Sequence, residues 1–215
     1  MKRFSRFVFL LVLSVLLSTR VLGVERVTLL PEKMSQGSPI HLLVGESKSF
    51  ITMQLAGQKW ISKNAKIASV SNGIVTGRKK GTTTIAHYNG RQWTAYKVTV
   101  YSNAKKRYFA EMKPYLKGKW GRNSSEYRNK YYKFDENYIK AYDKKTKKLI
   151  SKGKITSISR EKVSLDYRYH MVIEGNTKLV FYFKNRRFED AWYYFKQNGQ
   201  WKYSASGSFT HLTYK

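Results

Sequence analysis

The segment from Leu165 to Ile173 reads Leu-Asp-Tyr-Arg-Tyr-His-Met-Val-Ile, with large apolar side chains at nearly every second position. A period of two places successive side chains on opposite faces of a strand, so we expect a β-strand with one buried face. The next stretch repeats the pattern, with Leu179, Phe181 and Phe183 on one face. Gly175-Asn176 lies between the two runs and predicts a turn. Two such strands joined by a short turn indicate an antiparallel sheet.

Weaker strand candidates surround this pair. They are Tyr132–Phe134, Ile139–Tyr142, Lys154–Ile158, Ala191–Phe195, Trp201–Ser204 and Ser208–Tyr214. About eight sequential strands with short connections predict an antiparallel meander, and closing it into a small barrel would remove its exposed edges. A second sandwich without a cavity is the alternative. A short helix over Tyr108–Leu116 is expected before the first strand, because Phe109, Met112 and Leu116 recur at helical spacing.

The first half of the chain shows shorter strands separated by Gly, Asn and Ser. The candidates are Ile40–Val44, Ser49–Leu55, Lys59–Ser62, Ile67–Ser71, Ile74–Gly77, Thr82–Tyr88 and Gln92–Val100. Asn72-Gly73 lies between two apolar runs and predicts a hairpin turn, since glycine accepts a positive φ. This pattern favours an antiparallel sandwich, with Trp60 on a central strand as its core aromatic residue.

These segments resemble the group 2 bacterial immunoglobulin-like domain in order and spacing. The matching pieces are Val44–Ser47, Lys59–Asn64, Ile67–Gly77, Gly81–Ile85 and Tyr96–Val100. The resemblance implies an extracellular, non-catalytic module that serves as a stalk or spacer and sometimes takes part in adhesion or carbohydrate contact. Its motif residues form core and turns, so it implies no binding residue here.

A smaller resemblance concerns the second half, where Gly118-Lys119-Trp120 is similar to the Gly-x-Trp opening of lipocalin-like barrels. It implies a barrel with an interior pocket. We therefore expect an all-β chain: an Ig-like β-sandwich over residues 24–101, a linker over 102–107, and a basic, tyrosine-rich antiparallel β domain over 108–215, a lipocalin-like barrel.

The N-terminus predicts export. Lys2, Arg3 and Arg6 precede an apolar run over Phe7–Leu17, and small or compact residues follow, as in a secretory signal peptide cleaved after Gly23. An uncleaved membrane anchor is the alternative, but the run is shorter than the roughly 20 residues that a spanning helix needs. No second apolar run approaches that length, so we expect no transmembrane segment after cleavage. The predicted location is extracellular or cell-wall associated.

The charge balance predicts an anionic partner. Lys and Arg number 42 against 13 Asp and Glu, a net charge of +29, and residues 104–215 alone hold 27 basic and 10 acidic residues. The electrostatic field of so large a net positive charge attracts polyanions. For an exported chain we expect an anionic cell-envelope polymer or a host glycan, and no nucleic acid. The alternative is a merely solvated surface. The candidate polyanion-binding residues, all in predicted loops, are Lys144, Lys145, Lys147, Lys148, Arg186 and Arg187.

The aromatic runs Trp192–Phe195 and Tyr131-Tyr132 have two interpretations. Half of the side chains of an alternating strand point inward, and tyrosine is a good strand former, so sheet packing explains many of them. The outward half would be available to stack on sugar rings.

Catalysis finds little support in the sequence. The chain has no Cys, its four His lie in separate strands, and its adjacent acidic pairs point to opposite faces. We expect no catalytic residue, no metal and no cofactor, although a glycan-processing enzyme would need only two carboxylates across a cleft. The sequence therefore favours a secreted binding or adhesion protein. A carrier of a small apolar ligand in the barrel is the alternative, and the oligomeric state stays open.

Overall fold

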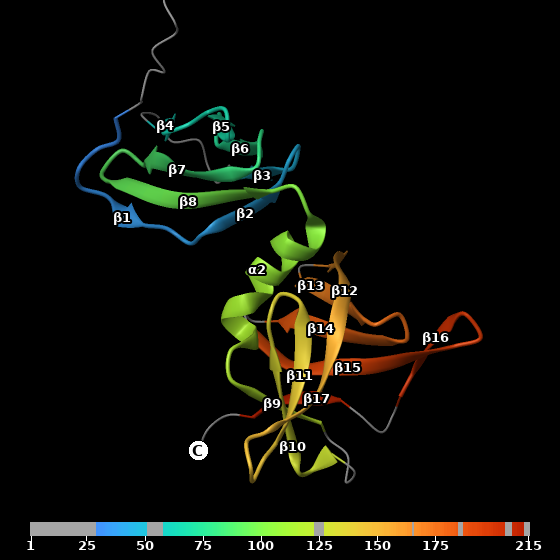
Figure 1. Cartoon of the computed structure of the whole chain (residues 1–215). Coiled ribbons are helices and arrows are strands. Elements are labelled where there is room, and N and C mark those ends of the chain that lie inside the picture. The colour runs from blue at the N-terminus through green and yellow to red at the C-terminus, as the bar shows by residue number, and fades with distance from the viewer. Residues whose placement is uncertain are drawn as a thin grey trace, which may run out of the picture.

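The computed structural model describes residues 29–50, 58–122, 127–164, 166–184, 187–204 and 208–212. In these ranges the chain forms two β-domains joined by a helix (Figure 1), which confirms the predicted all-β class. The predicted signal peptide, residues 1–23, lies outside the described ranges. None of the described helical segments has the length and apolar character required to cross a membrane.

The N-terminal domain is a two-sheet sandwich. Its strands are β1 (Ser35–Gln36), β2 (Ile40–Leu43), β3 (Ser47–Ser49), β4 (Lys59–Ser62), β5 (Ala68–Ser71), β6 (Ile74–Gly77), β7 (Gly81–Tyr88) and β8 (Trp93–Tyr101). One sheet has the order β1-β8-β7-β4, with β2 also paired to β8, and the other has the order β3-β6-β5. The core is formed by Ile40, Leu42, Ala68, Val75, Ile85, Val98 and Val100.

Two details of the sandwich test the sequence analysis. Asn72 and Gly73 have φ values of 45° and 74°. Ser71 pairs directly with Ile74, so the predicted two-residue hairpin turn is confirmed. Trp60 packs partly buried against the core, but the prediction of a central strand is wrong, because within the described sheet β4 pairs only with β7 and lies at the edge. Most of the predicted strand Ser49–Leu55 lies outside the described residues.

The C-terminal domain is a closed antiparallel barrel. Its strands are β9 (Lys119–Arg122), β10 (Lys130–Phe134), β11 (Tyr138–Asp143), β12 (Leu149–Val163), β13 (Asp166–Ile173), β14 (Thr177–Lys184), β15 (Arg187–Gln197), β16 (Gln200–Tyr203) and β17 (Phe209–Leu212). Strands β9 to β15 pair each with the next, and β17 pairs with both β15 and β9, which closes a ring of eight. Strand β16 pairs with β15 outside this ring (Figure 1). The predicted meander and its closure are confirmed.

Side chains fill the described interior of the barrel. The predicted alternation is confirmed, since Met171, Leu179 and Phe181 are fully buried. Trp120 is also fully buried, and its ring meets those of Phe134 and Phe181 edge to face, with centroids 5.8 and 5.7 Å away. These residues belong to one continuous cluster of buried side chains in the described part of the barrel. The carrier alternative gains no support from it.

Helix α2 (Ala104–Leu116) connects the two domains and packs against the barrel. The side chain of Asn103 accepts a hydrogen bond from the backbone N–H of Lys106 at 3.1 Å and caps the helix. Phe109, Met112 and Leu116 join the barrel core, as their spacing predicts. The helix starts four residues before the predicted Tyr108, because the Asn103 cap lies inside the predicted linker 102–107.

The early start of the helix buries Arg107, whose exposed fraction is 2%. Its guanidinium bonds Glu46 of the sandwich at 2.9 Å and Glu111, one turn further along the helix, at 2.5 Å. Arg160 of β12 lies 3.2 Å from Glu111 and 3.6 Å from Glu46, and the Tyr169 hydroxyl donates to Glu111 at 3.0 Å. We call these five residues the junction network. Burial and the charge of Glu111 raise the pKa of Tyr169, so its phenol stays protonated and can donate.

The first prediction concerns the stability of this network. Arg107→Met keeps much of the buried volume but leaves the two carboxylates without their central cation, and losing one partner of a buried ion pair costs about 3–5 kcal/mol. We expect a loss of about 3 kcal/mol in the free energy of unfolding, measured by chemical denaturation, because Arg160 remains near both carboxylates.

The matched control is Lys106→Met. Lys106 pairs with Glu136 at 3.6 Å, with side chains 58% and 42% exposed. Exposed pairs contribute about 0–1 kcal/mol, so this variant is expected to stay close to the parent. Equal losses in the two variants would contradict the role given to the junction network.

Candidate binding surface on the barrel

The outer face of strands β13 to β16 gathers aromatic and basic side chains. Residues paired across antiparallel strands share a face, and the register pairs Arg168 with Tyr182, Lys178 with Tyr194, and Tyr194 with Tyr203. The side chains on the opposite face of these strands, such as Met171 and Phe181, point into the core. We define the aromatic–basic face as Arg168, Lys178, Tyr182, Trp192, Tyr194, Lys196, Trp201 and Tyr203.

The cations of this face lie beside aromatic rings. The ammonium of Lys178 is 4.8 Å from the ring centre of Tyr194 and 4.9 Å from that of Trp201. The guanidinium of Arg168 is 5.6 Å from Tyr182 and 5.8 Å from Trp192. These distances are within the range of cation–π attraction, which holds long side chains in place. The face thus presents charges and flat rings side by side.

Part of this surface is open to solvent and part is desolvated. Tyr203 is 54% exposed and Trp192 is 38% exposed, which leaves ring surface available to a partner. Burial lowers the pKa of Lys178, and the Nε atom of Arg168 is buried without a hydrogen-bond partner in the described part of the chain. A cation that has lost part of its hydration gains more from a bound anion than a fully solvated one. This arrangement therefore favours a ligand that can stack a ring on the exposed aromatic side chains and place a negative charge beside the cations.

The predicted lysine cluster lies elsewhere, at the turn between β11 and β12. Lys144, Lys145, Lys147 and Lys148 are all exposed there, as the loop prediction requires. The Asp143 carboxylate organises the turn by accepting hydrogen bonds from the backbone N–H groups of Thr146 and Lys145, at 2.6 and 2.9 Å. The bonds from Thr146 contribute most to lowering the pKa of Asp143. The turn thus presents four exposed lysines, and the Lys147 ammonium donates a hydrogen bond to the Lys144 carbonyl.

The two predicted basic clusters do not come together. Arg186 and the side chain of Arg187 lie outside the described residues, but the β14–β15 hairpin closes at the pair Lys184 and Arg187. Strand β12 starts directly after the lysine turn and runs 15 residues to Val163, next to the end where that hairpin closes. The clusters are therefore at opposite ends of the barrel.

Sequence reasoning identified only part of the aromatic–basic face. The outward-facing half of Trp192–Phe195 was expected to be available for stacking, and Trp192 and Tyr194 do lie on the outer face whereas Tyr193 packs against the core. The contributions of Lys178, Arg168 and Tyr203 were missed. The alternation predicts their face, but only the strand register shows that they adjoin the two rings.

The surface shows no metal-binding arrangement. No group of three or more His, Cys, Asp or Glu side chains capable of holding a metal ion occurs in the ranges that the structure describes. His170 and Glu161 form a polar pair on the same outer face, with their Nε2 and Oε2 atoms 3.1 Å apart.

Comparisons with known proteins leave the family open. No protein-family model matches the chain, and no curated protein matches it at a significant level. Domains 5-6 of the S-layer protein SbsC give a TM-score of 0.26 at 16% identity, covering 67% of this chain and 86% of that one. A longer structure, rSbsC(31-844), gives 0.27 at 14% identity, covering 79% of this chain and 25% of that one. Similarity at this level establishes neither fold nor function, and the Ig-like resemblance stays a prediction.

The second prediction tests the local field of the face by fluorescence quenching. Anionic iodide is expected to quench Trp192 strongly, and cationic caesium weakly, because Arg168 and Lys178 lie near the exposed ring. Trp192→Phe should therefore remove much of the iodide-quenchable emission. Trp93→Phe, a change of a partly buried residue in the sandwich, is the control. A ratio of iodide to caesium quenching at Trp192 no higher than that of a neutral free tryptophan derivative would show that the face has no positive field.

Proposed function

We propose that the protein is a non-catalytic extracellular binding protein that adheres to acidic glycans through the aromatic–basic face of its barrel. The observation that carries the proposal is the placement of aromatic rings beside partly desolvated cations, as at the exposed Trp192 with Arg168 and at the half-buried Tyr194 with Lys178. The predicted signal peptide supports an extracellular location. An anionic cell-envelope polymer and a host glycosaminoglycan both have the required chemistry.

The charge of the chain supports capture of such a polymer. Residues 24–215, which remain after the predicted cleavage, hold 38 basic and 13 acidic residues, and this net charge of +25 attracts polyanions over the Debye length, about 8 Å at physiological salt, and raises the rate of encounter. This attraction is unspecific and must weaken as salt is added. The lysines of the β11–β12 turn contribute to this attraction because they are exposed.

The aromatic rings provide stacking contacts with sugars, which charge alone does not provide. An aromatic face packs against the apolar C–H face of a sugar ring, and a neighbouring Lys or Arg bonds a carboxylate, sulfate or phosphate on the same sugar. Tyr203 and Trp192 are the most exposed rings of the face. A polymer of sugars with regularly spaced anionic groups fits this pairing better than a chain of phosphates alone.

The sandwich then has the role of a spacer, as the Ig-like resemblance implies. The junction network ties it to the barrel through Glu46, so the binding domain is held at a fixed orientation to the spacer. In this arrangement the aromatic–basic face belongs to the barrel alone, and binding is expected to reside in that domain.

The third prediction separates ring stacking from charge. Trp192→Ala combined with Tyr203→Ala leaves the net charge unchanged, yet we expect affinity for purified teichoic acid or heparin to fall about 10- to 100-fold at physiological salt, at about 1 kcal/mol or more per stacked ring. Isothermal titration calorimetry over a series of salt concentrations measures both the affinity and its salt dependence.

The matched comparison replaces Lys144, Lys145, Lys147 and Lys148 with Gln. We expect the glycan affinity of this variant to depend less on salt concentration than that of the parent, and to keep the part that comes from ring stacking. If the variant with Trp192→Ala and Tyr203→Ala bound the glycan as tightly as the parent, the aromatic–basic face would not be the binding site. Tighter binding to single-stranded DNA than to either glycan would refute an acidic glycan as the ligand.

A further inference from the structure

The β11–β12 hairpin carries two neighbouring apolar side chains that are open to solvent. Leu149 is 51% exposed and Ile150 is 47% exposed, although both belong to strand β12. We call these two residues the apolar pair. Every residue from 144 to 152 is exposed, so the tip of the hairpin projects from the barrel. In Figure 1 this turn lies at the end of the barrel that is far from the sandwich.

A β-bulge accounts for the exposure of both residues. Leu149 pairs with Tyr142 and Ser151 pairs with Ala141, so Ile150 is an extra residue in β12. Neighbours in a regular strand point to opposite faces, whereas a bulge interrupts this alternation and redirects side chains. Bulges are frequent at the rims of barrels, and the one at Ile150 keeps the apolar pair out of the core.

Basic side chains adjoin the apolar pair. Four exposed lysines precede it on the turn, namely Lys144, Lys145, Lys147 and Lys148. Residues 143–150 contain one acidic residue, Asp143, and therefore have a net charge of +3. The Asp143 carboxylate accepts hydrogen bonds from the backbone of the turn, so it serves to shape the turn. The tip of the hairpin thus combines apolar surface with positive charge.

This combination matches the surface of an anionic lipid bilayer. Negative head groups attract lysines, whose long alkyl stems allow the ammonium groups to stay at the interface while adjacent apolar side chains enter the acyl boundary. A soluble polyanion would pair with the lysines but would leave the apolar pair in water. Removal of that pair from water is favourable in proportion to the area buried, which distinguishes a bilayer from other polyanions.

We propose that the β11–β12 hairpin docks the protein on an anionic lipid bilayer. Leu149 and Ile150 lie at the boundary between head groups and acyl chains, and the turn lysines lie among the head groups. The position of the turn at one extremity of the barrel allows a flat surface to reach it. The contact shares no residue with the aromatic–basic face, and it does not rest on the binding of acidic glycans.

The first test measures binding to vesicles by sedimentation. The protein consists of residues 24–215, which contain both domains and lack the apolar run of the predicted signal peptide. Vesicles contain equal parts of phosphatidylglycerol and phosphatidylcholine, or phosphatidylcholine alone. We expect binding to the anionic vesicles to be stronger by about tenfold or more. Equal binding to the two kinds of vesicle would overturn the proposal.

A double variant tests the apolar pair without changing the charge. Leu149→Ser combined with Ile150→Ser should weaken binding to the anionic vesicles by about tenfold or more, because the apolar contribution is lost. The matched control is Val44→Ser combined with Ile74→Ser, which changes two apolar residues of the sandwich that are 49% and 40% exposed. The control should bind like the parent. Equal binding by the two double variants would overturn the proposal.

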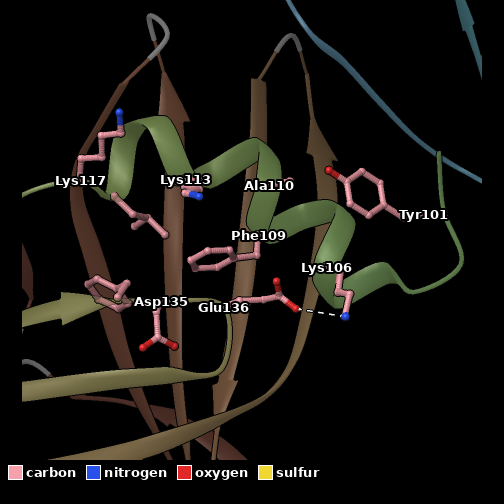
Figure 2. A pocket seen from close by; sticks show the side chains of 10 residues that line it. Tyr101, Lys106, Phe109, Ala110, Lys113, Lys117, Asp135 and Glu136 are labelled. Atoms are coloured by element: carbon pink, nitrogen blue, oxygen red, sulfur yellow. Dashed lines mark ion pairs between the residues drawn. The ribbon is translucent and has the colours of Figure 1, made fainter. Parts of the chain in front are cut away.

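A matched pair of charge reversals locates the contact. Lys148→Glu alters the charge beside the apolar pair and should weaken vesicle binding by about fivefold or more. Lys113→Glu makes the same change at the other end of β11, where Lys113 lines a cleft between helix α2 and the β10–β11 turn (Figure 2). This second variant should bind nearly as tightly as the parent. Equal weakening by the two reversals would show a diffuse effect of net charge and overturn the proposal.

An introduced cysteine reports insertion directly, because the chain has no cysteine of its own. Ile150→Cys and Ile74→Cys are each labelled with a nitrobenzoxadiazole dye, whose emission rises and shifts to the blue in apolar surroundings. We expect this response to anionic vesicles at position 150 and not at position 74. Vesicle binding without a response at position 150 would show adsorption by charge alone and overturn the proposal.

Parallel measurements separate this proposal from the proposed function. Each variant is first checked for parental thermal unfolding. The variant with Leu149→Ser and Ile150→Ser should keep the glycan affinity of the parent, and the variant with Trp192→Ala and Tyr203→Ala should keep its vesicle binding. If the second variant lost vesicle binding and the first did not, the bilayer contact would be the aromatic–basic face and the proposal for the hairpin would be overturned.

Discussion

The arrangement of the two domains depends on the ion pairs of the buried Arg107 guanidinium with Glu46 and Glu111. A charge that is 2% exposed must be paired, and its partners come from the sandwich at Glu46 and from the helix at Glu111. Arg160 of the barrel shares both carboxylates, so three parts of the chain meet at a single set of charges. Because this set fixes the position of α2, it also fixes the cleft between the helix and the β10–β11 turn.

Closure of the barrel is the second constraint, and it determines what the outer surface presents. Successive side chains of a strand point to opposite faces, so an aromatic residue committed to the core leaves its two neighbours on the outer face. Tyr193 packs inward, and Trp192 and Tyr194 consequently face solvent beside Arg168 and Lys178. The aromatic–basic face thus follows from the same periodicity that fills the core. Its residues are brought together by register and not by proximity in sequence.

The sequence predicted those features that depend on local pattern. A period of two predicted the buried faces of β13 and β14, and Asn72-Gly73 predicted its turn because the conformation is set by two residues. The edge position of Trp60 depends on strand order, which adjacent residues do not encode. Arg107 looked like part of a polar linker because its partner Glu46 is 61 positions away. The junction network and the cleft were beyond prediction for that reason.

Net charge alone makes a protein adhere to many polyanions, so selectivity must come from the way in which the charges are held. The lysines of the β11–β12 turn are exposed, and an anion bound to an exposed ammonium group displaces water that solvates the charge well, so the net gain is small. Lys178 is different, because burial lowers its pKa and two ring faces restrict its ammonium group. Under the proposed function, an anion bound at Lys178 lies beside those two rings, and a ligand without a face that can stack on them gains less. Under the proposed function, the surplus charge would account for attraction to polyanions, and the ordered cations on the barrel would provide the basis for discrimination among them.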